Sequence, residues 1–316
     1  MQTVLGYKNT NTMKETKHKV VVVGGAGFIG SHISDALIER GFEVHVIDNL
    51  SGGKRENLNP KAEFHEVDIR ELEAIKPIIK GADFVFHLAA LPRVQYSIEH
   101  PAETHEVNVT GTQNVLIASK EGGVKRVIYS ASSSAYGDQT VMPLVETMTP
   151  NPKSPYGLHK YVGEVYAKVW SGVYGLETVS LRYFNVYGPR INPDGAYPLA
   201  IGKFLKQRLA GKPMTIWGDG TQTRDFTHVR DVVQANLLAM ESKNVGKGEV
   251  INIGAGKNFS INQVAKLIGG PVVHEPARIE PHDTLADNSL AKKLLGWVPE
   301  VGLEAGIAEL KKLWKI

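Results

Sequence analysis

The sequence predicts an α/β fold, a doubly wound parallel sheet with a smaller C-terminal lobe. Three observations lead to this prediction. The β-branched run Val20–Val23 is typical of a strand buried on both faces. A glycine-rich turn follows it and leads into a helix-like segment, Ser31–Arg40. Strand-like and helix-like segments then alternate as far as Ile253, which implies parallel strands joined by right-handed crossovers.

The expected elements follow in chain order. Strands are expected at Val20–Val23, Phe42–Asp48, Phe64–Asp68, Phe84–Ala90, Arg126–Ser130, Glu177–Asn185 and Glu249–Ile253. Helices are expected at Ser31–Arg40, Arg70–Lys80 (interrupted by Pro77), Val107–Lys120, Tyr156–Tyr174 and Val229–Ser242. Two stretches, 186–223 and 257–316, break the alternation, and within them we expect helices at Pro198–Ala210, Ile261–Ile268, Ser289–Leu295 and Leu303–Leu313.

Composition limits the classes of function. A chain of 316 residues that is 42% hydrophobic and 22% charged is neither disordered nor fibrous. A net charge of +3 with scattered basic residues gives little support to nucleic-acid or membrane-surface binding. Without cysteine there are no disulfides or thiolate sites, and the 11 histidines show no metal-ligand spacing, so no metal is expected. With neither a signal peptide nor a spanning segment, we expect a soluble cytoplasmic protein.

The glycine-rich turn predicts a dinucleotide site. Gly24, Gly27 and Gly30 stand between a strand and a helix, where glycine lets the backbone approach a pyrophosphate. The helix N-terminus adds free N–H groups and a positive dipole end. Asp48 ends the next strand close to the spacing of about 20 residues expected for the carboxylate that binds the ribose 2′-OH. We therefore expect a Rossmann domain that binds NAD rather than NADP; the alternative is a tight turn that merely requires glycine.

Tyr156 and Lys160 give the second functional signal. Pro155 suits the entry to a helix, and residues four apart then share one helix face. A tyrosine with its ordinary pKa of about 10 is a poor base at neutral pH. A nearby lysine charge favours the phenolate and so brings the group towards acid–base work. Alone, the spacing also fits an ordinary solvated helix.

The breaks in alternation suggest the domain organisation. We expect a flexible tail, 1–18; an NAD-binding Rossmann domain, 19–185 plus 225–256; and a nucleotide-sugar-binding lobe, 186–224 plus 257–316. A ligand cleft is expected between the two, at the carboxyl ends of the strands.

With both signals in place, the chain resembles the extended short-chain dehydrogenase/reductase superfamily, and more closely its UDP-galactose 4-epimerase group. The likeness runs from about Lys19 to Ile316. Its motifs are GGAGFIGSH, VIDNLSGG, HLAA, VNVTGTQNVL, YSASSSAYGD, SPYGLHKYVGE, LRYFNVYGPR and TRDFTHVRDVVQAN. Val23 departs from the family, which usually has threonine before the first glycine.

The resemblance implies NAD as the cofactor and a set of residues around it, with Asp68 and Ile69 meeting the adenine. The implied contacts are Gly24, Gly27, Phe28, Ile29, Gly30, Asp48, Asn49, Asp68, Ile69, Ala89, Ala90, Asn108, Ser130, Tyr156, Lys160 and Tyr183.

For catalysis the resemblance implies Tyr156 and Lys160, with Ser132 as proton relay and Ser133 as a second candidate. Ordinary turn chemistry is the alternative for these serines. Ser133 and Ser134 stand where related dehydratases and decarboxylases carry acids, which favours epimerisation. Tyr156, its pKa lowered by Lys160 and the nicotinamide, would take the proton of the sugar 4-OH while C4 hydride passes to NAD. The 4-keto sugar would then turn and receive the hydride on its other face.

On the substrate side, the resemblance implies that Asn185 binds the diphosphate, Trp217 lies near the uracil and Arg224 pairs with phosphate. An ordinary buried aromatic is the alternative for Trp217. Ala277 stands where the family has a phosphate-binding arginine, so it is open whether Arg278 or His282 replaces it. The implied substrate residues are Ser132, Asn185, Gly195, Ala196, Tyr197, Leu199, Trp217, Arg224, Arg278 and Thr284.

Thr284 bears on the sugar. It occupies the position that in the family gates the C2 substituent, where a small side chain leaves room for an N-acetyl group. We therefore expect a 4-epimerase of UDP-N-acetylglucosamine and UDP-N-acetylgalactosamine that also accepts plain hexoses. The alternatives are a strict UDP-glucose 4-epimerase, a UDP-glucuronate 4-epimerase, and a non-catalytic sensor of NAD or a nucleotide sugar.

Two helices suggest self-association. Val107–Lys120 and Tyr156–Tyr174 carry apolar side chains on more than one face, among them Val162, Val165, Tyr166 and Val169. In the family these helices pair with their copies in a homodimer, whereas a helix that is apolar all round can also be buried within one subunit.

Overall fold

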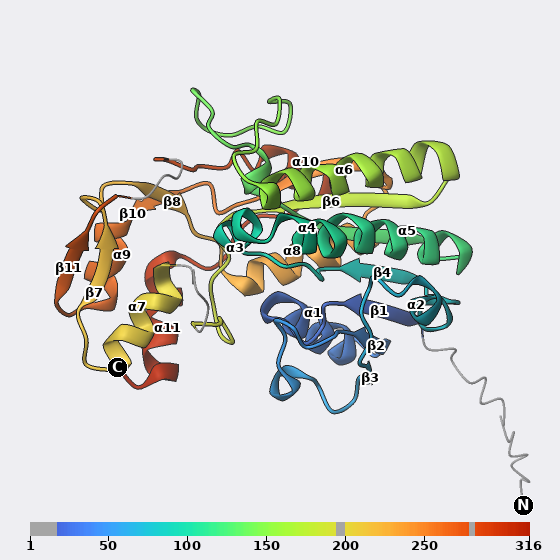
Figure 1. Ribbon diagram of the computed structural model, residues 1–316, viewed down its shortest axis with the longest axis horizontal. Helices are drawn as coiled ribbons and strands as arrows, with labels where there is room; N and C mark the ends of the chain where they lie inside the picture. The colour runs from blue at the N-terminus through green and yellow to red at the C-terminus, as the bar shows by residue number, and fades with distance from the viewer. Residues whose placement is uncertain (1–17, 194–199, 278–281) are drawn as a thin grey trace, which may run out of the picture.

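The computed structural model describes residues 18–193, 200–277 and 282–316 (Figure 1). Seven strands form one parallel sheet in the order β3-β2-β1-β4-β5-β6-β9. They are β1 (Lys19–Val23), β2 (Glu43–Ile47), β3 (Glu63–His65), β4 (Phe84–His87), β5 (Arg126–Ser132), β6 (Glu177–Tyr183) and β9 (Lys247–Ile253). The doubly wound Rossmann fold predicted from the sequence is confirmed.

Helices cover both faces of this sheet. Apolar side chains of α1 (Phe28–Glu39), α8 (Val229–Glu241) and α10 (Ser289–Leu295) pack with Val20 and Val22 on one face. Those of α2 (Leu72–Ile79), α5 (Gly111–Glu121) and α6 (Pro155–Tyr174) pack with Val21 and Val23 on the other. Alternate residues of β1 thus enter opposite cores, as expected for a strand buried on both faces.

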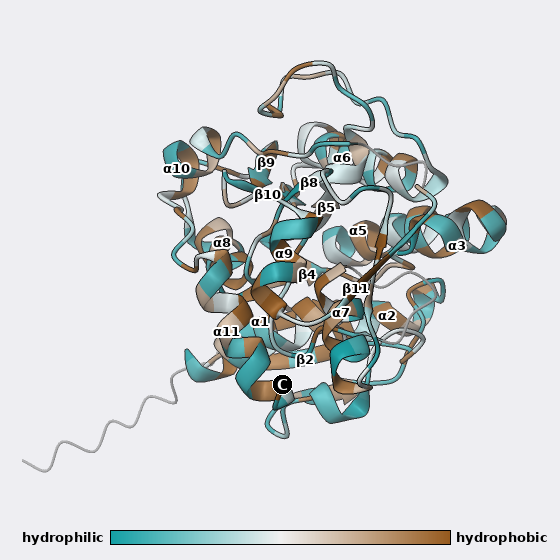
Figure 2. Ribbon diagram, turned by 90° about the vertical axis from the view of Figure 1, so that its left-hand side faces the viewer, coloured by the Kyte–Doolittle hydropathy of each residue, from teal (hydrophilic) through white to brown (hydrophobic). Residues whose placement is uncertain are grey.

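A separate apolar cluster lies beside the sheet, at the left of Figure 1. It joins α7 (Ala200–Leu209), α9 (Ile261–Ile268) and α11 (Leu303–Trp314) to β7 (Met214–Trp217), which pairs with β11 (Val272–Glu275). The outward turn of α9 is hydrophilic in Figure 2, because Asn262 and Gln263 are exposed there. The predicted boundaries between the Rossmann domain (19–185 plus 225–256) and the smaller lobe (186–224 plus 257–316) remain a prediction.

Several elements differ from the sequence prediction. The predicted helix Val107–Lys120 is a π-helical segment, Glu106–Thr110 (η2), followed by α5. Six short elements were not predicted: α3 (Val94–Glu99), α4 (Pro101–His105), β7, β8 (Thr223–Asp225), β10 (Asn258–Ser260) and β11. Two further short turns are 3-10 helices, η1 (Arg55–Asn57) and η3 (Ser133–Ala135).

The predicted flexible tail, 1–18, lies outside the described residues except for His18, which bonds to Asp83 (3.0 Å). Among the residues described, no helix has the length and apolar character needed to span a membrane.

Candidate active site

The glycine turn joins β1 to α1 through two close approaches. Gly24 has φ +86°, and a Cβ there would lie 2.5 Å from the Ala89 nitrogen. A Cβ on Gly30 would lie 2.2 Å from the Gly24 oxygen. Gly27 precedes α1 and has no side chain to cap it, so the first-turn N–H groups, at Phe28 and Ile29, are not used by an N-cap side chain and are available to a ligand. The turn therefore fits a dinucleotide pyrophosphate.

Asp48 follows β2 and is tied to the glycine turn. Its carboxylate accepts hydrogen bonds from the backbone N–H groups of Ala26 (3.0 Å) and Leu50 (2.8 Å). Burial raises the pKa of Asp48, and the two backbone bonds oppose that shift. Two bonds leave acceptor capacity on the carboxylate for ribose hydroxyls.

Polar side chains at the ends of β2 and β3 connect to each other. The Asn49 amide donates to Asp68 (2.9 Å), whose carboxylate also accepts from Arg70 (2.7 Å). The Arg70 bond lowers the pKa of Asp68 to about 2. Ile69, next to Asp68, is buried and packs against Gly111. A Cβ on Gly111 would lie 2.5 Å from the Ile69 Cδ1 atom. Asn49, Asp68 and Arg70 are thus linked by hydrogen bonds into one polar edge, with the apolar Ile69 beside it.

Asn108 braces the loop that follows β4. Its amide oxygen accepts from the Leu91 N–H (2.7 Å) and its amide nitrogen donates to the Leu91 carbonyl (3.2 Å). These two hydrogen bonds to Leu91 hold the loop in place and so fix the path of the neighbouring Ala89 and Ala90. In the chain itself, Asn108 therefore positions a loop that faces the glycine turn.

The predicted catalytic residues come from the end of β5, with Ser132 and Ser133, and from the start of α6, with Tyr156 and Lys160. Ser154 caps α6 by accepting from the Gly157 N–H (3.1 Å), and Pro155, predicted at the helix entry, is the first helical residue, one before the predicted start at Tyr156. A Cβ on Gly157 would lie 2.6 Å from the Ser134 oxygen, so glycine is required for this close approach. Ser132 is the last residue of β5, two residues beyond the predicted end of the strand at Ser130, and Ser133 begins η3.

Lys160 lies one turn after Tyr156 and is buried. Its ammonium donates to the Ser130 carbonyl (2.7 Å) and lies 5.1 Å from the Tyr129 ring centroid. Burial lowers the pKa of Lys160 to about 8, while the charge of Glu164 raises it. Tyr183, on the adjacent strand, is buried and donates to the Asn236 side chain (2.9 Å).

The pKa of Tyr156 bears on one expectation. Burial raises it in the chain itself, and a hydrogen bond with the Ser132 side chain is the opposing effect. In the chain itself Lys160 alone therefore does not bring the pKa of Tyr156 below its ordinary value, and the lowering by Lys160 together with the nicotinamide charge stays a prediction. The Ser132 side chain is thus close enough to the Tyr156 phenol to oppose the effect of burial, and its role as a proton relay stays a prediction.

A second group of residues lies at the carboxyl end of β6. Asn185 has φ +34° and donates to the Asp225 carbonyl (3.0 Å). The Thr284 hydroxyl lies 3.4 Å from both the Asn185 amide and the Asp225 N–H. Arg224 is buried and donates to the carbonyl of His282 (2.9 Å), whose own side chain is exposed. Three predicted substrate residues, Asn185, Arg224 and Thr284, thus converge.

Asp225 organises this second group, although the sequence reasoning did not single it out. It is fully buried, and its carboxylate accepts from the N–H groups of Ala255 (2.8 Å), Gly256 (3.0 Å) and Ala286 (3.1 Å). Burial raises its pKa to about 6 despite these bonds. The sequence signal that could have identified Asp225 is the motif TRDFTHVRDVVQAN, which contains both Arg224 and Asp225.

Trp217 is half-buried in β7, and the Lys203 ammonium lies 3.4 Å from its ring centroid. The remaining predicted substrate residues, Gly195, Ala196, Tyr197, Leu199 and Arg278, lie outside the described residues.

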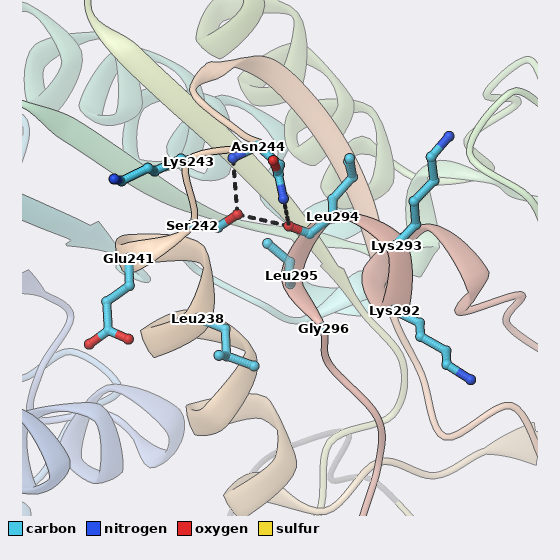
Figure 3. Close-up of a pocket in the computed structure, with 10 residues that line it drawn as sticks. All are labelled: Leu238, Glu241, Ser242, Lys243, Asn244, Lys292, Lys293, Leu294, Leu295 and Gly296. Carbon is cyan, nitrogen blue, oxygen red and sulfur yellow. Dashed lines mark hydrogen bonds between the residues drawn. The ribbon is translucent and has the colours of Figure 1, made fainter.

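Two surface hollows mark different places. One, of about 260 Å³, adjoins the glycine turn and includes Phe28, Asn57 and Arg190. The other lies between the ends of α8 and α10, where Ser242 and Asn244 bond to the Leu294 carbonyl (Figure 3). Because the chain enters β9 from α8, this second hollow is at the amino end of the sheet. It is therefore separate from the site.

Comparisons with known proteins agree with this geometry. A model of the NAD-dependent epimerase/dehydratase family matches residues 20–254. A putative UDP-glucose 4-epimerase of Methanocaldococcus jannaschii is 41% identical over 91% of this chain and 95% of its own. The structure of a Thermotoga maritima UDP-glucose 4-epimerase with UDP-glucose is 42% identical, with a TM-score of 0.88 over 93% of this chain and 99% of its own.

A third relative differs in its named substrate. It is a UDP-N-acetylglucosamine 4-epimerase of Methanobrevibacter ruminantium in complex with UDP-N-acetylmuramic acid, 37% identical with a TM-score of 0.88 over 94% of this chain and 99% of its own.

The Rossmann fold with its glycine turn is typical of enzymes that use NAD, and the chain belongs to the NAD-dependent epimerase/dehydratase family. Within it, the chain groups with the UDP-sugar 4-epimerases of the extended short-chain dehydrogenase/reductase superfamily. It is an isomerase with NAD as its cofactor, as the sequence predicted.

Proposed function

We propose that this enzyme interconverts UDP-N-acetylglucosamine and UDP-N-acetylgalactosamine, and that it accepts UDP-glucose and UDP-galactose as well. The observation that carries the proposal is Thr284. Its small side chain lies within the Asn185 and Asp225 group, its hydroxyl 3.4 Å from each. A threonine there leaves volume beside the sugar that a large aromatic side chain would fill. The cytoplasmic location predicted from the sequence is part of this proposal.

In this proposal the chain's own residues hold and move a proton. Tyr156 takes the proton of the sugar 4-OH and returns it, and the neighbouring Ser132 hydroxyl relays it between the sugar oxygen and Tyr156. Lys160, fixed on the Ser130 carbonyl, keeps a positive charge beneath the site. Bound NAD supplies the chemistry of taking and returning a hydride at C4. The reaction therefore has no net redox change.

The nucleotide must stay anchored while the 4-keto sugar turns. Asn185 and Arg224 are held by backbone carbonyls of neighbouring segments (3.0 and 2.9 Å), so their positions are set before substrate arrives. An arginine suits diphosphate oxygens because its planar fork can bind two of them. We propose that Asn185 and Arg224 bind the diphosphate and that Trp217 lies near the uracil. Together they would hold the UDP moiety against the smaller lobe.

The substrate proposal is tested by supplying UDP-N-acetylglucosamine, UDP-glucose and UDP-glucuronate in parallel and following the C4 epimers by proton NMR. Conversion of the acetylated sugar is expected, with slower conversion of UDP-glucose. Conversion of UDP-glucose alone would favour a strict hexose epimerase, and of UDP-glucuronate alone a uronate epimerase. Binding without conversion of any of them would favour the sensor interpretation.

Changing Thr284→Tyr should affect the acetylated substrate first. The phenol ring would occupy the space assigned to the N-acetyl group, so kcat/KM for UDP-N-acetylglucosamine should fall about 10–100-fold relative to UDP-glucose. Steady-state kinetics on both substrates measure the ratio. Thr284→Ser, which keeps a small hydroxyl, is the control and should leave the ratio near that of the parent. An unchanged ratio in the tyrosine variant would contradict the gate.

We also propose that the enzyme is a homodimer that pairs through α6. Leu158, Val165, Val169 and Val173 lie along one side of this helix and are 41–70% exposed. The exposure of Val165 and Val169 supports pairing with a second copy over burial of this side of the helix within one subunit. A stripe of this kind fits the matching stripe of a second copy, as closed two-fold dimers require.

The dimer proposal predicts that Val169→Glu yields a monomer, because a carboxylate at the centre of the seam would be buried without a partner. Sedimentation velocity measures the mass. Val298→Glu, at an equally exposed valine (44% against 41%) outside this stripe, is the control and should leave the dimer intact. A parent protein that sediments as a monomer would refute the proposal.

A further inference from the structure

Two histidines and a glutamate meet at the outer edge of the sheet, away from the active site. The edge strand β3 pairs with β2 in parallel, with His45 beside Glu63 and Ile47 beside His65. Side chains two residues apart on a strand share a face. His45, Glu63 and His65 therefore lie together on the sheet face of Val21, Val23 and Ile47, a set that no sequence spacing revealed.

The three donor atoms already have the spacing of a metal site. The His45 Nδ1 atom lies 3.1 Å from the His65 Nε2 atom. Glu63 carboxylate oxygens lie 3.4 Å from His65 Nε2 and 3.6 Å from His45 Nδ1. In a tetrahedral zinc site with bonds of 2.0–2.1 Å, neighbouring donor atoms are about 3.3 Å apart. The three atoms thus outline one face of such a tetrahedron.

A fourth residue supports the inner histidine. The Glu43 carboxylate lies 3.0 Å from His45 Nε2, so it accepts the proton of that nitrogen. This bond leaves the Nδ1 lone pair of His45 directed at the cluster. A carboxylate that holds the outer nitrogen of a metal-binding imidazole is the usual second partner in zinc sites.

Exposure and charge also suit a divalent ion. The imidazoles are sheltered, with side chains 9% (His45) and 22% (His65) exposed, whereas Glu63 is 62% and Glu43 is 53% exposed. An ion can therefore enter from the carboxylate side. Two carboxylates and two neutral imidazoles offset a charge of +2. The nearby Lys19 ammonium donates to the Lys80 carbonyl (3.2 Å).

We propose that His45, His65 and Glu63 bind one Zn²⁺-class ion, with a solvent oxygen as the fourth ligand and Glu43 as a positioning residue. Two imidazoles and one carboxylate select zinc or cobalt over magnesium or calcium, which prefer oxygen ligands alone. The ion would clamp the edge strand β3 to β2. These two strands lead into Asp68 and Asp48, so the clamp would stabilise the adenine end of the cofactor site.

The test is a Co²⁺ titration of the untagged, full-length protein, read by the visible absorption of tetrahedral cobalt. One ion per chain is expected. His65→Gln should abolish this absorption, and Glu43→Gln, which keeps all three ligands, should weaken affinity about 10–100-fold. His274→Gln, which changes a histidine of β11 bonded to the Gly218 carbonyl (2.8 Å), is the matched control and should bind cobalt like the parent.

Glu63→Gln provides a second ligand variant at an exposed side chain, in case His65→Gln alters folding, which far-UV circular dichroism would reveal. Loss of the tetrahedral signal in this variant supports the site. Parent-like binding in both ligand variants would overturn it, as would a spectrum of weakly bound six-coordinate cobalt, which would mean an adventitious ion only. The readout is independent of epimerase activity.

Discussion

Replacing Tyr156 with phenylalanine is expected to lower kcat by roughly 10²–10⁴-fold, the usual contribution of a positioned acid–base group. The substitution removes only the phenol oxygen, which lies near the Ser132 side chain. The ring that packs at the start of α6 stays, as do the Ser154 cap and the Lys160 bond to Ser130. Cofactor retention and the fold should therefore be unchanged.

Product formation is measured by NMR of the C4 epimers, and cofactor content by release of NAD from the denatured protein. Tyr174→Phe, at the far end of the same helix and 47% exposed, removes a phenol oxygen away from the site and should retain parent turnover. If Tyr156→Phe turned over substrate at the parent rate with full NAD content, the acid–base assignment would be wrong.

The elements predicted well are those whose pattern is local. The run Val20–Val23, the glycines after it and Pro155 at the entry to a helix each specify their structure within a few residues, and the structure reproduces them. The strands β8 and β10 have three residues each, too few for periodicity to distinguish them from loops. The π-helical segment Glu106–Thr110 likewise keeps an apolar pattern that reads as ordinary helix.

The site was predicted as a set of residues but not as a set of contacts. Asn185 and Thr284 are 99 residues apart, and only the fold brings them within 3.4 Å. The backbone of Asp225 connects them, because its carbonyl accepts from Asn185 and its N–H lies 3.4 Å from the Thr284 hydroxyl. The pKa of Tyr156 depends on burial, which the Tyr156–Lys160 spacing does not encode.

Glu164 connects the stability of the fold to the site. It lies one turn after Lys160 in α6, and its carboxylate accepts two hydrogen bonds from the Arg182 guanidinium (2.8 and 2.7 Å). Both side chains are almost fully buried, 2% and 3% exposed, and the guanidinium lies 4.3 Å from the Tyr136 ring centroid. This buried pair joins the catalytic helix to β6.

Glu164→Gln should destabilise the protein by about 3–5 kcal/mol, because it leaves the buried Arg182 charge without its counterion and turns an amide N–H towards a donor. Urea unfolding measures the change. Glu241→Gln breaks an exposed pair with Arg40 of similar length (2.7 Å) and should cost less than about 1 kcal/mol. Equal costs for the two variants would show that burial does not govern the pair.

The same substitution should also change the pH dependence of turnover. Burial holds the pKa of Lys160 at about 8, and the Glu164 charge opposes that lowering. Without the carboxylate the pKa of Lys160 falls further, so the lysine loses its proton at a lower pH. The alkaline decline of kcat should therefore begin at lower pH in Glu164→Gln than in the parent, whereas Glu241→Gln should leave the profile in place. A purely structural role for Glu164 would lower the amount of folded enzyme without moving that decline.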